Sequence, residues 1–242
     1  MLMEYRLKSY VADFRNRFGY NSTEPIGFSS LLQKLDILSI FKPLSEDFSG
    51  LSIKDGDSRF MLVNCNHSVG RQNFTIGHEL YHLFYDKDFT PHKCQTGLFP
   101  RKNGNERMAD IFASYLLLPE EGILQLISDE ELGKDQIKLA TLLRIEQTYS
   151  SSRAALLNQL SKMDLASKSF VEKYSTQIKT GARQHGYSVD LYEHTGDKAI
   201  LGTFGSLANK LFEKDQISES HYQELMLSIG IDVNEIVSDE EN

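Results

Sequence analysis

The amino-acid sequence predicts an α+β fold in which a small, mostly antiparallel sheet packs on one amphipathic helix. A helical segment and a helix-rich C-terminal extension are predicted to follow. Short apolar or alternating runs between residues 37 and 63 are typical of strands. Apolar residues recur at helical spacing over residues 70–86, and again in several stretches after residue 105. Such a sheet needs a helix on one face to bury its apolar side.

The N-terminal part is predicted to hold two helices before the sheet. Residues 3–18 have apolar positions at helical intervals, and Gly19 favours a helix end. Residues 29–35 form a second helix, which a serine can cap. The strands are predicted at residues 37–41, 50–53 and 59–63. Between the last two, K-D-G-D at residues 54–57 is typical of a hairpin turn. An exposed edge strand could pair with an extended peptide.

The rest of the chain is mainly helical in pattern. Residues 87–105 form a polar loop whose length is typical of functional loops. A helix at residues 106–118 ends before Pro119. Further helices are predicted at residues 136–145, 152–160, 169–183, 206–212 and 219–227, and strands at 189–192 and 199–201. We therefore expect a first domain at 1–120, a helical subdomain at 121–165 and an extension of unknown role at 166–242.

Composition excludes several classes of protein. The net charge of −8 argues against a phosphate backbone as the main partner. The two cysteines, Cys65 and Cys94, are too few for a disulfide framework and fit a reducing cytoplasm, with Cys65 expected to be a buried thiol. The N-terminus has charges where a signal peptide would be apolar, and no segment approaches the roughly 18 apolar residues of a membrane span. We expect a cytoplasmic protein with no membrane partner.

Within the helix at 70–86, His78, Glu79 and His82 form the pattern H-E-x-x-H. Residues four apart on a helix differ by about 40° around its axis, so both imidazoles point to one place. This geometry suits a tetrahedral zinc ion. Glu79 lies about 100° round from His78, where it can receive a proton from a water molecule at the metal. The alternative is a helix whose two histidines have structural roles only.

A catalytic zinc usually takes three protein ligands, and the best candidate for the third is Glu106. Glu106 and Asp110 are four apart and share a helix face. One of them can bind the metal while the other accepts the spare N–H of a ligand histidine. Ala109 and Ala113 would let the two helices approach closely. The alternative is that Glu106 is an ordinary acid at a helix N-terminus.

Two motifs now resemble a known family. The resemblance is carried by R-x-x-F-T-I-x-H-E-L-x-H at residues 71–82, by E-x-x-A-D-x-F-A-x-x-L-L-x-P at residues 106–119, and by the strand at 59–64. The chain resembles the ImmA/IrrE family of zinc metallopeptidases over about residues 20–160. The resemblance implies a zincin-like, gluzincin-type fold for residues 1–120. It implies that one zinc ion is bound by His78, His82 and Glu106. It also implies that Glu79 is the catalytic acid/base and that Asp110 is hydrogen-bonded to a ligand.

The resemblance also implies a biological role. Members are intracellular, are often encoded by mobile genetic elements or stress-response loci, and are typically linked to cleavage of a helix-turn-helix transcriptional repressor. We therefore expect a zinc endopeptidase that cleaves a repressor and so switches genes on. The alternative is a non-proteolytic regulatory protein of the same fold that docks to a repressor or to DNA. The intact Glu79 favours the enzyme, because a pure binder does not need it.

One position departs from the family pattern. Tyr81 stands where the family usually has glycine, and we expect its ring either to crowd the ligand face or to turn toward the sheet. A further donor should stabilise the negative charge that develops on the substrate carbonyl oxygen. Four candidates stay open, each with a structural role as the alternative: Tyr81, His67, His92 and Tyr115.

Residues 134–183 carry nine lysines and arginines against four acids, a net charge of +5. The helix–serine turn–helix pattern at 136–160 has the form of a helix-turn-helix, in which Arg153, Asn158 and Gln159 could read bases. DNA is therefore a possible but less favoured partner. The favoured interpretation is a helical subdomain that packs on the peptidase, with its charges solvated or paired.

Overall fold

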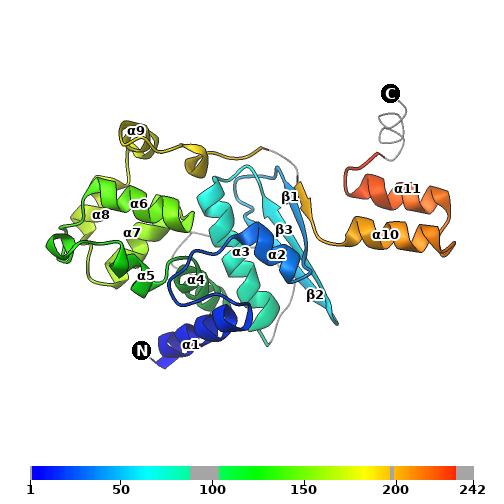
Figure 1. Cartoon of the computed structure of the whole chain (residues 1–242), viewed down its shortest axis with the longest axis horizontal. Coiled ribbons are helices and arrows are strands. Elements are labelled where there is room, and N and C mark those ends of the chain that lie inside the picture. The colour runs from blue at the N-terminus through cyan, green and yellow to red at the C-terminus, as the bar shows by residue number, and fades with distance from the viewer. Residues whose placement is uncertain (1, 88–103, 197–198, 233–242) are drawn as a thin grey trace.

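The computed structural model describes residues 2–87, 104–196 and 199–232 and has the predicted α+β architecture (Figure 1). Four strands form one sheet in the order β2-β3-β1-β4. Their bounds are Leu38–Lys42 (β1), Gly50–Asp55 (β2), Ser58–Asn64 (β3) and Ala199–Leu201 (β4). β1 pairs parallel with β3, while the β1–β4 and β2–β3 pairs are antiparallel. The predicted mostly antiparallel sheet is confirmed, and within the described ranges β2 and β4 are its edges.

The hairpin between β2 and β3 forms where the K-D-G-D sequence predicts it. Gly56 has φ of +53°, a conformation that glycine adopts without steric cost. Side chains alternate along β2, with Gly50 and Ser52 buried and Ile53 exposed. The buried face of β2 is therefore the face that meets the helices.

Two helices dominate the buried side of the sheet. α3 (Val69–Phe84) packs against β2 and β3 and lies along α4 (Gly104–Leu117). A Cβ atom at Gly77 would lie 3.3 Å from the Cβ atom of Ala113, so the backbones of α3 and α4 come close there. Ala109 and Ala113 are both fully buried. The predicted close approach of these helices through small residues is confirmed.

One buried apolar cluster runs from Leu7 to Phe170. It takes side chains from the sheet, from α1 (Leu2–Arg17) and α2 (Phe28–Lys34), and from the helices that follow α4. Those helices are α5 (Glu120–Gln125), α6 (Leu139–Tyr149), α7 (Arg153–Lys162) and α8 (Lys168–Tyr174). Segments 1–120 and 121–165 thus share a core, and the division at residues 120 and 165 stays a prediction.

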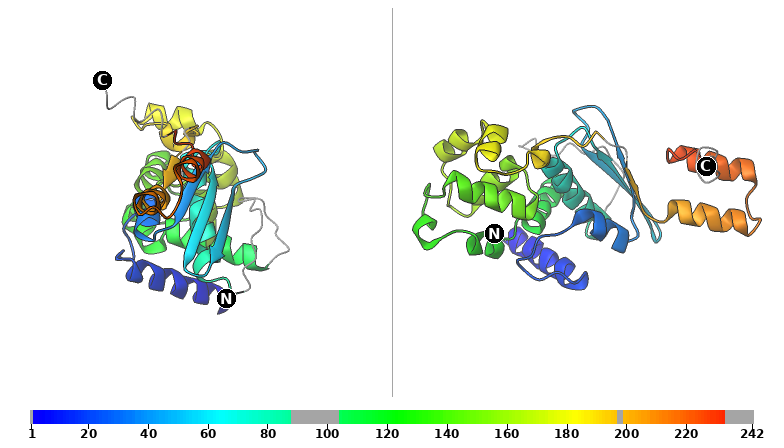
Figure 2. Two further views of the ribbon diagram at one scale, coloured as in Figure 1. Left: turned by 90° about the vertical axis from the view of Figure 1, so that its right-hand side faces the viewer. Right: turned by 45° about the horizontal axis from the view of Figure 1, so that its top comes forward.

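The C-terminal extension crosses from the helical part of the molecule to the far edge of the sheet. The Glu193 carbonyl accepts a 3.0 Å hydrogen bond from the Val69 N–H at the start of α3. The backbones of Ser68 and His194 form an isolated antiparallel β-bridge. After β4, the helices α10 (Phe204–Glu213) and α11 (Glu219–Ser228) form a hairpin that projects from the body (Figures 1 and 2). Its buried side chains form a separate small cluster: Ala208, Met226 and Ile229.

Several predicted elements were wrong in detail. The helix predicted at 169–183 is two helices, α8 and α9 (Ile178–Gln184), because Gln177 adopts φ of +54° and breaks the helical path. Residues 189–192 contain a 3₁₀ turn, η2 (Asp190–Tyr192), and not a strand. The cap of α2 is Gly27 and not a serine. α5 and the 3₁₀ turn η1 (Asp129–Glu131) were not predicted.

The part of the chain that the structure describes contains no helix long and apolar enough to cross a membrane.

A glycine-to-alanine pair tests the packing of α3. A Cβ atom at Gly70 would lie 2.6 Å from the Ser152 nitrogen and 2.8 Å from the Ser151 carbonyl carbon, both backbone atoms of the turn between α6 and α7. We expect Gly70→Ala to lower the free energy of unfolding by about 1–3 kcal/mol in denaturant titrations, as overpacking does. Gly104→Ala is the control, because a Cβ atom there meets no atom of the described residues within 4 Å. Equal stability of the two variants would contradict this packing.

Candidate metal centre

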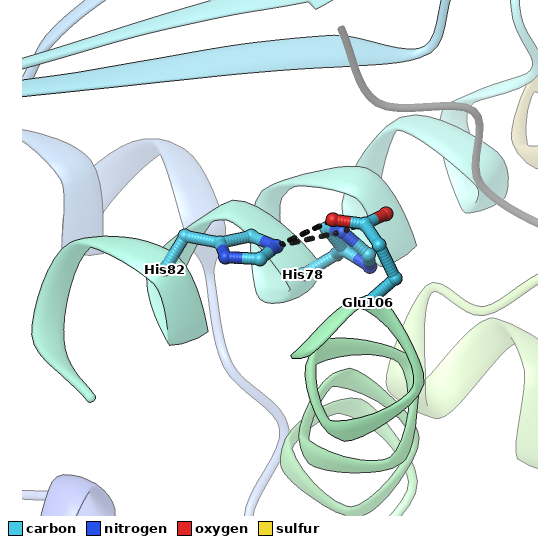
Figure 3. A group of neighbouring side chains, drawn as sticks. All are labelled: His78, His82 and Glu106. Carbon is cyan, nitrogen blue, oxygen red and sulfur yellow. Dashed lines mark hydrogen bonds and ion pairs between the residues drawn. The ribbon is translucent and has the colours of Figure 1, made fainter. Parts of the chain in front are cut away.

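α3 and α4 bring the three predicted ligands together (Figure 3). His78 and His82 project from successive turns of α3, and Glu106 lies in the first turn of α4. A ligand atom from each of the three lies within 4.8 Å of the others. The side chains of both histidines are 1% exposed or less, and that of Glu106 is 9% exposed. Two helices that touch through glycine and alanine thus carry three ligands to one buried point.

The distances at this point fit a tetrahedral metal. His78 Nε2 and His82 Nε2 are 3.2 Å apart. Glu106 Oε1 is 3.2 Å from His82 Nε2, and Glu106 Oε2 is 3.5 Å from His78 Nε2. Zinc binds nitrogen and oxygen at roughly 2.0–2.2 Å, which places tetrahedral ligands about 3.3 Å from one another. The three side chains are therefore spaced as ligands of one ion would be.

The other imidazole nitrogens are hydrogen-bonded to carboxylates. His78 Nδ1 lies 2.9 Å from Asp110 Oδ1, and His82 Nδ1 lies 2.9 Å from Asp86 Oδ2. A carboxylate accepts, so each Nδ1 donates its N–H, and a neutral ring held in this way turns an Nε2 lone pair to the shared point. Two facing lone pairs and a carboxylate repel one another unless a cation or a proton lies between them. The donor set therefore suits a divalent metal.

The structure places Asp110 where the sequence predicts a partner for a ligand histidine. Asp86 has the same relation to His82, and the sequence reasoning missed it. The signal was present, because Asp86 follows His82 by four residues, the spacing that links Glu106 and Asp110. The side chain of Asn105, just before Glu106, donates a 3.2 Å hydrogen bond to Asp86 Oδ1. These carboxylates hold the rings in the orientation that a metal ligand needs.

Glu79 lies on α3 between the two histidines and faces β2. The Ser52 hydroxyl donates a 2.7 Å hydrogen bond to Glu79 Oε2, and both residues are buried. Ser52 was not predicted, since its contact depends on how β2 docks on α3. The Glu79 carboxylate is therefore bonded to the sheet and is not one of the three side chains that converge on the shared point.

Tyr81 does not turn toward the sheet. Its ring packs beside Phe112 of α4 at 5.8 Å and meets the His82 ring edge-on at 5.6 Å, and its hydroxyl lies 3.5 Å from Met108 Sδ. Burial is the main cause that raises the pKa of Tyr81 to about 12, with Asp86 adding to it. Tyr81 is therefore a neutral phenol at physiological pH, next to the His82 ring.

The other predicted oxyanion donors are engaged elsewhere or not described. Tyr115 donates a 2.5 Å hydrogen bond to Glu4, and His67 donates one of 3.1 Å to the Glu46 carbonyl. Burial, helped by the nearby Arg71, lowers the pKa of His67. His92, Cys94 and most of the predicted 87–105 loop lie outside the described residues. Cys65 is fully buried, as predicted.

The basic segment at residues 134–183 exposes fewer of the candidate base-reading side chains than its composition indicates. Arg153 and Gln159, two of the three side chains expected to read bases, are 2% and 0% exposed. Arg153 makes a two-point ion pair with Glu146, which is also buried. α7 therefore presents to solvent only Asn158 of the three.

The carboxylate behind His82 provides a test of the centre. We expect Asp86→Ala to weaken zinc affinity by about 10–100-fold, because such partners orient a ligand histidine and raise its basicity. Competition against a chromogenic chelator measures this affinity. Asp57→Ala, an exposed aspartate in the β2–β3 turn, is the control and should match the wild type. Unchanged affinity in Asp86→Ala would mean that the Asp86–His82 contact does not support a ligand.

Comparison with known proteins agrees with this centre. No curated protein matches the chain. A family profile described as the IrrE N-terminal-like domain, of a peptidase family, matches residues 32–161 of the 242. The matched region contains β1 to β3, α3 to α6 and all but the last residue of α7, and therefore all three candidate ligands. The chain belongs to the IrrE N-terminal-like family, which supports a metallopeptidase-type function.

Proposed function

We propose that this protein is a zinc-dependent endopeptidase that hydrolyses a peptide bond in a cytoplasmic protein substrate. The observation that carries the proposal is the convergence of His78, His82 and Glu106 on one buried point, with Glu79 held separately beside it. Family membership supports the general class of activity. A pure binding protein has no need of a buried carboxylate next to such a centre, so Glu79 favours the enzyme over the docking alternative.

His78, His82 and Glu106 would hold the metal. When bound, zinc lowers the pKa of water to near 7 and polarises a carbonyl group as a Lewis acid. The chain's own residues do the rest. Asp110 and Asp86 keep the two imidazoles in one tautomer and one orientation. Glu79 would accept a proton from the water molecule that attacks the scissile carbonyl, and would give this proton to the leaving amine.

The edge strand β2 offers a place for the substrate backbone. Among the described residues β2 has one neighbour in the sheet, β3, and its buried face packs on α3 beside Glu79. An extended peptide that adds to the open edge of β2 would lie along the helix that carries the ligands. In this mode of binding the affinity comes from main-chain hydrogen bonds, so it suits an extended protein segment better than a small molecule.

The resemblance to ImmA/IrrE proteins favours a helix-turn-helix transcriptional repressor as the substrate. Its cleavage would switch on genes of a stress response or a mobile genetic element. The non-proteolytic alternative, docking to a repressor or to DNA, predicts that the same genes respond without any cut.

The test compares cells that produce the wild type with cells that produce Glu79→Gln, by proteome-wide mapping of protein N-termini and by transcript levels. We expect new N-termini within a DNA-binding repressor, and induced transcripts, in the wild type only. The same induction in both strains with no new N-terminus would support the docking alternative and overturn the peptidase. New N-termini confined to other proteins would keep the peptidase and overturn the repressor as substrate.

A further inference from the structure

We infer that Ser52 is a positioning residue for Glu79 and that β2, through Ser52 and Gly50, sets the orientation of this carboxylate. The inference rests on the proposed peptidase function. Its central contact is the 2.7 Å hydrogen bond from the Ser52 hydroxyl to Glu79 Oε2. Each of the two residues is 2% exposed, so the bond is shielded from competing solvent.

Gly50 makes the second half of the arrangement. Gly50 and Ser52 lie two apart on β2 and share its buried face. A Cβ atom at Gly50 would lie 2.6 Å from Thr75 Cγ2 and 3.3 Å from Glu79 Oε1. The strand therefore passes so close to α3 that only glycine fits there without a shift. The backbone at Gly50 thus lies close to Glu79 Oε1, while Ser52 bonds Oε2.

The two carboxylate oxygens consequently differ. Oε2 accepts the hydrogen bond from Ser52, whereas Oε1 is buried and has no hydrogen-bond partner among the described residues. The last torsion of a glutamate side chain is broad and roughly two-fold, so an unrestrained carboxylate exchanges its oxygens readily. The bond to Ser52 restrains this exchange and leaves Oε1, which has no hydrogen-bond partner among the described residues, as the oxygen available to accept a proton. A general base works best when its reacting oxygen is already in place.

A buried serine in a strand can also serve structure alone, and the sheet contains such a residue. Ser39 of β1 is fully buried, and its hydroxyl donates to the Ile37 carbonyl at 3.1 Å, away from Glu79. Ser39 and Ser52 are therefore a matched pair. Loss of either hydroxyl removes one buried hydrogen bond, but only the Ser52 hydroxyl touches the general base.

The first experiment uses the full zinc-loaded chain and fluorescein-labelled casein, or the substrate found by N-terminal mapping. For Ser52→Ala we expect kcat to fall by about 10–100-fold, with KM within about twofold and zinc content unchanged, as for loss of a hydrogen bond to a charged group. Ser52→Thr keeps the hydroxyl and should restore most of kcat. Ser39→Ala should keep the wild-type kcat, and its melting temperature should fall by about as much as that of Ser52→Ala. Equal kcat in Ser52→Ala and Ser39→Ala would overturn the inference.

The second readout does not depend on activity. A crystal structure of Ser52→Ala should show the Glu79 carboxylate rotated or in more than one position, whereas Ser39→Ala should leave it in place. An unmoved carboxylate in Ser52→Ala would overturn the positioning role even if the wild type proves inactive. Inactive wild-type protein with a displaced carboxylate would instead count against the proposed peptidase and leave the positioning intact.

Discussion

Replacement of Glu79 by glutamine should lower kcat/KM for peptide hydrolysis by about 10²–10⁴-fold, the usual contribution of a general acid–base residue. Glutamine keeps the size of the side chain and can still accept the hydrogen bond from Ser52. It cannot take a proton at neutral pH. Because the three ligands lie elsewhere, the variant should bind as much zinc as the wild type. Steady-state cleavage of a quenched fluorescent peptide and elemental analysis measure the two quantities.

The control for this variant is Glu121→Gln, an exposed glutamate in the first turn of α5 that should cleave as the wild type does. Two outcomes would contradict the assigned role. Full activity in Glu79→Gln would mean that another group accepts the proton. Loss of zinc in Glu79→Gln would mean that Glu79 is a ligand and not the base.

Replacement of Arg153 by alanine should destabilise the fold by about 3–5 kcal/mol, the cost of removing one partner of a buried ion pair. Arg153 and Glu146 are 2% and 0% exposed. The arginine also donates a 3.0 Å hydrogen bond to the Tyr174 carbonyl, and Tyr192 donates one of 2.6 Å to Glu146. The variant leaves Glu146 buried without its counter-ion. Urea titration followed by circular dichroism gives the free energy of unfolding.

The pH dependence of the stability lost in Arg153→Ala distinguishes the loss of the counter-ion from the loss of packing. Burial raises the pKa of Glu146, and Arg153 and Tyr192 oppose this shift. A carboxyl with a raised folded-state pKa loses stability as pH rises from its ordinary pKa through the folded value. Without Arg153 the pKa rises further, so the cost of the substitution should be greatest near about pH 7.5 and shrink toward about pH 5.

Lys134→Ala is the control for Arg153→Ala. Lys134 pairs with Asp164 at 2.7 Å on the surface, where ion pairs are worth about 0–1 kcal/mol. Its effect on the free energy of unfolding should be small at both pH values. A cost for Arg153→Ala as small as that for Lys134→Ala would mean that the pair does not organise the interior.

Local rules account for the parts of the site that the sequence predicts. The helical period alone puts His78 and His82 on one face, and the spacing of Glu106 and Asp110 on the next helix follows the same rule. Asp86 obeys that rule too and could have been found. Ser52 could not, because its bond to Glu79 depends on the register of β2 and on its docking against α3.

Prediction of the fold from local sequence patterns has the same limit. The strands and the hairpin were predictable from alternation and turn residues, whereas the break in the helix predicted at 169–183 depends on the positive φ of Gln177. Arg153 stayed a candidate base reader because a charge count cannot tell a solvated arginine from one buried against Glu146. Burial of a charge is decided by its tertiary partner.

The central claim is that His78, His82 and Glu106 bind one metal ion, and the metal content of the purified protein tests it most directly. Plasma mass spectrometry of the wild type should give about one zinc per chain. His78→Ala and Glu106→Ala should each lose the metal, while His221→Ala, an exposed histidine of α11, should retain it. A full zinc complement in either ligand variant, or none in the wild type after zinc reconstitution, would contradict the account.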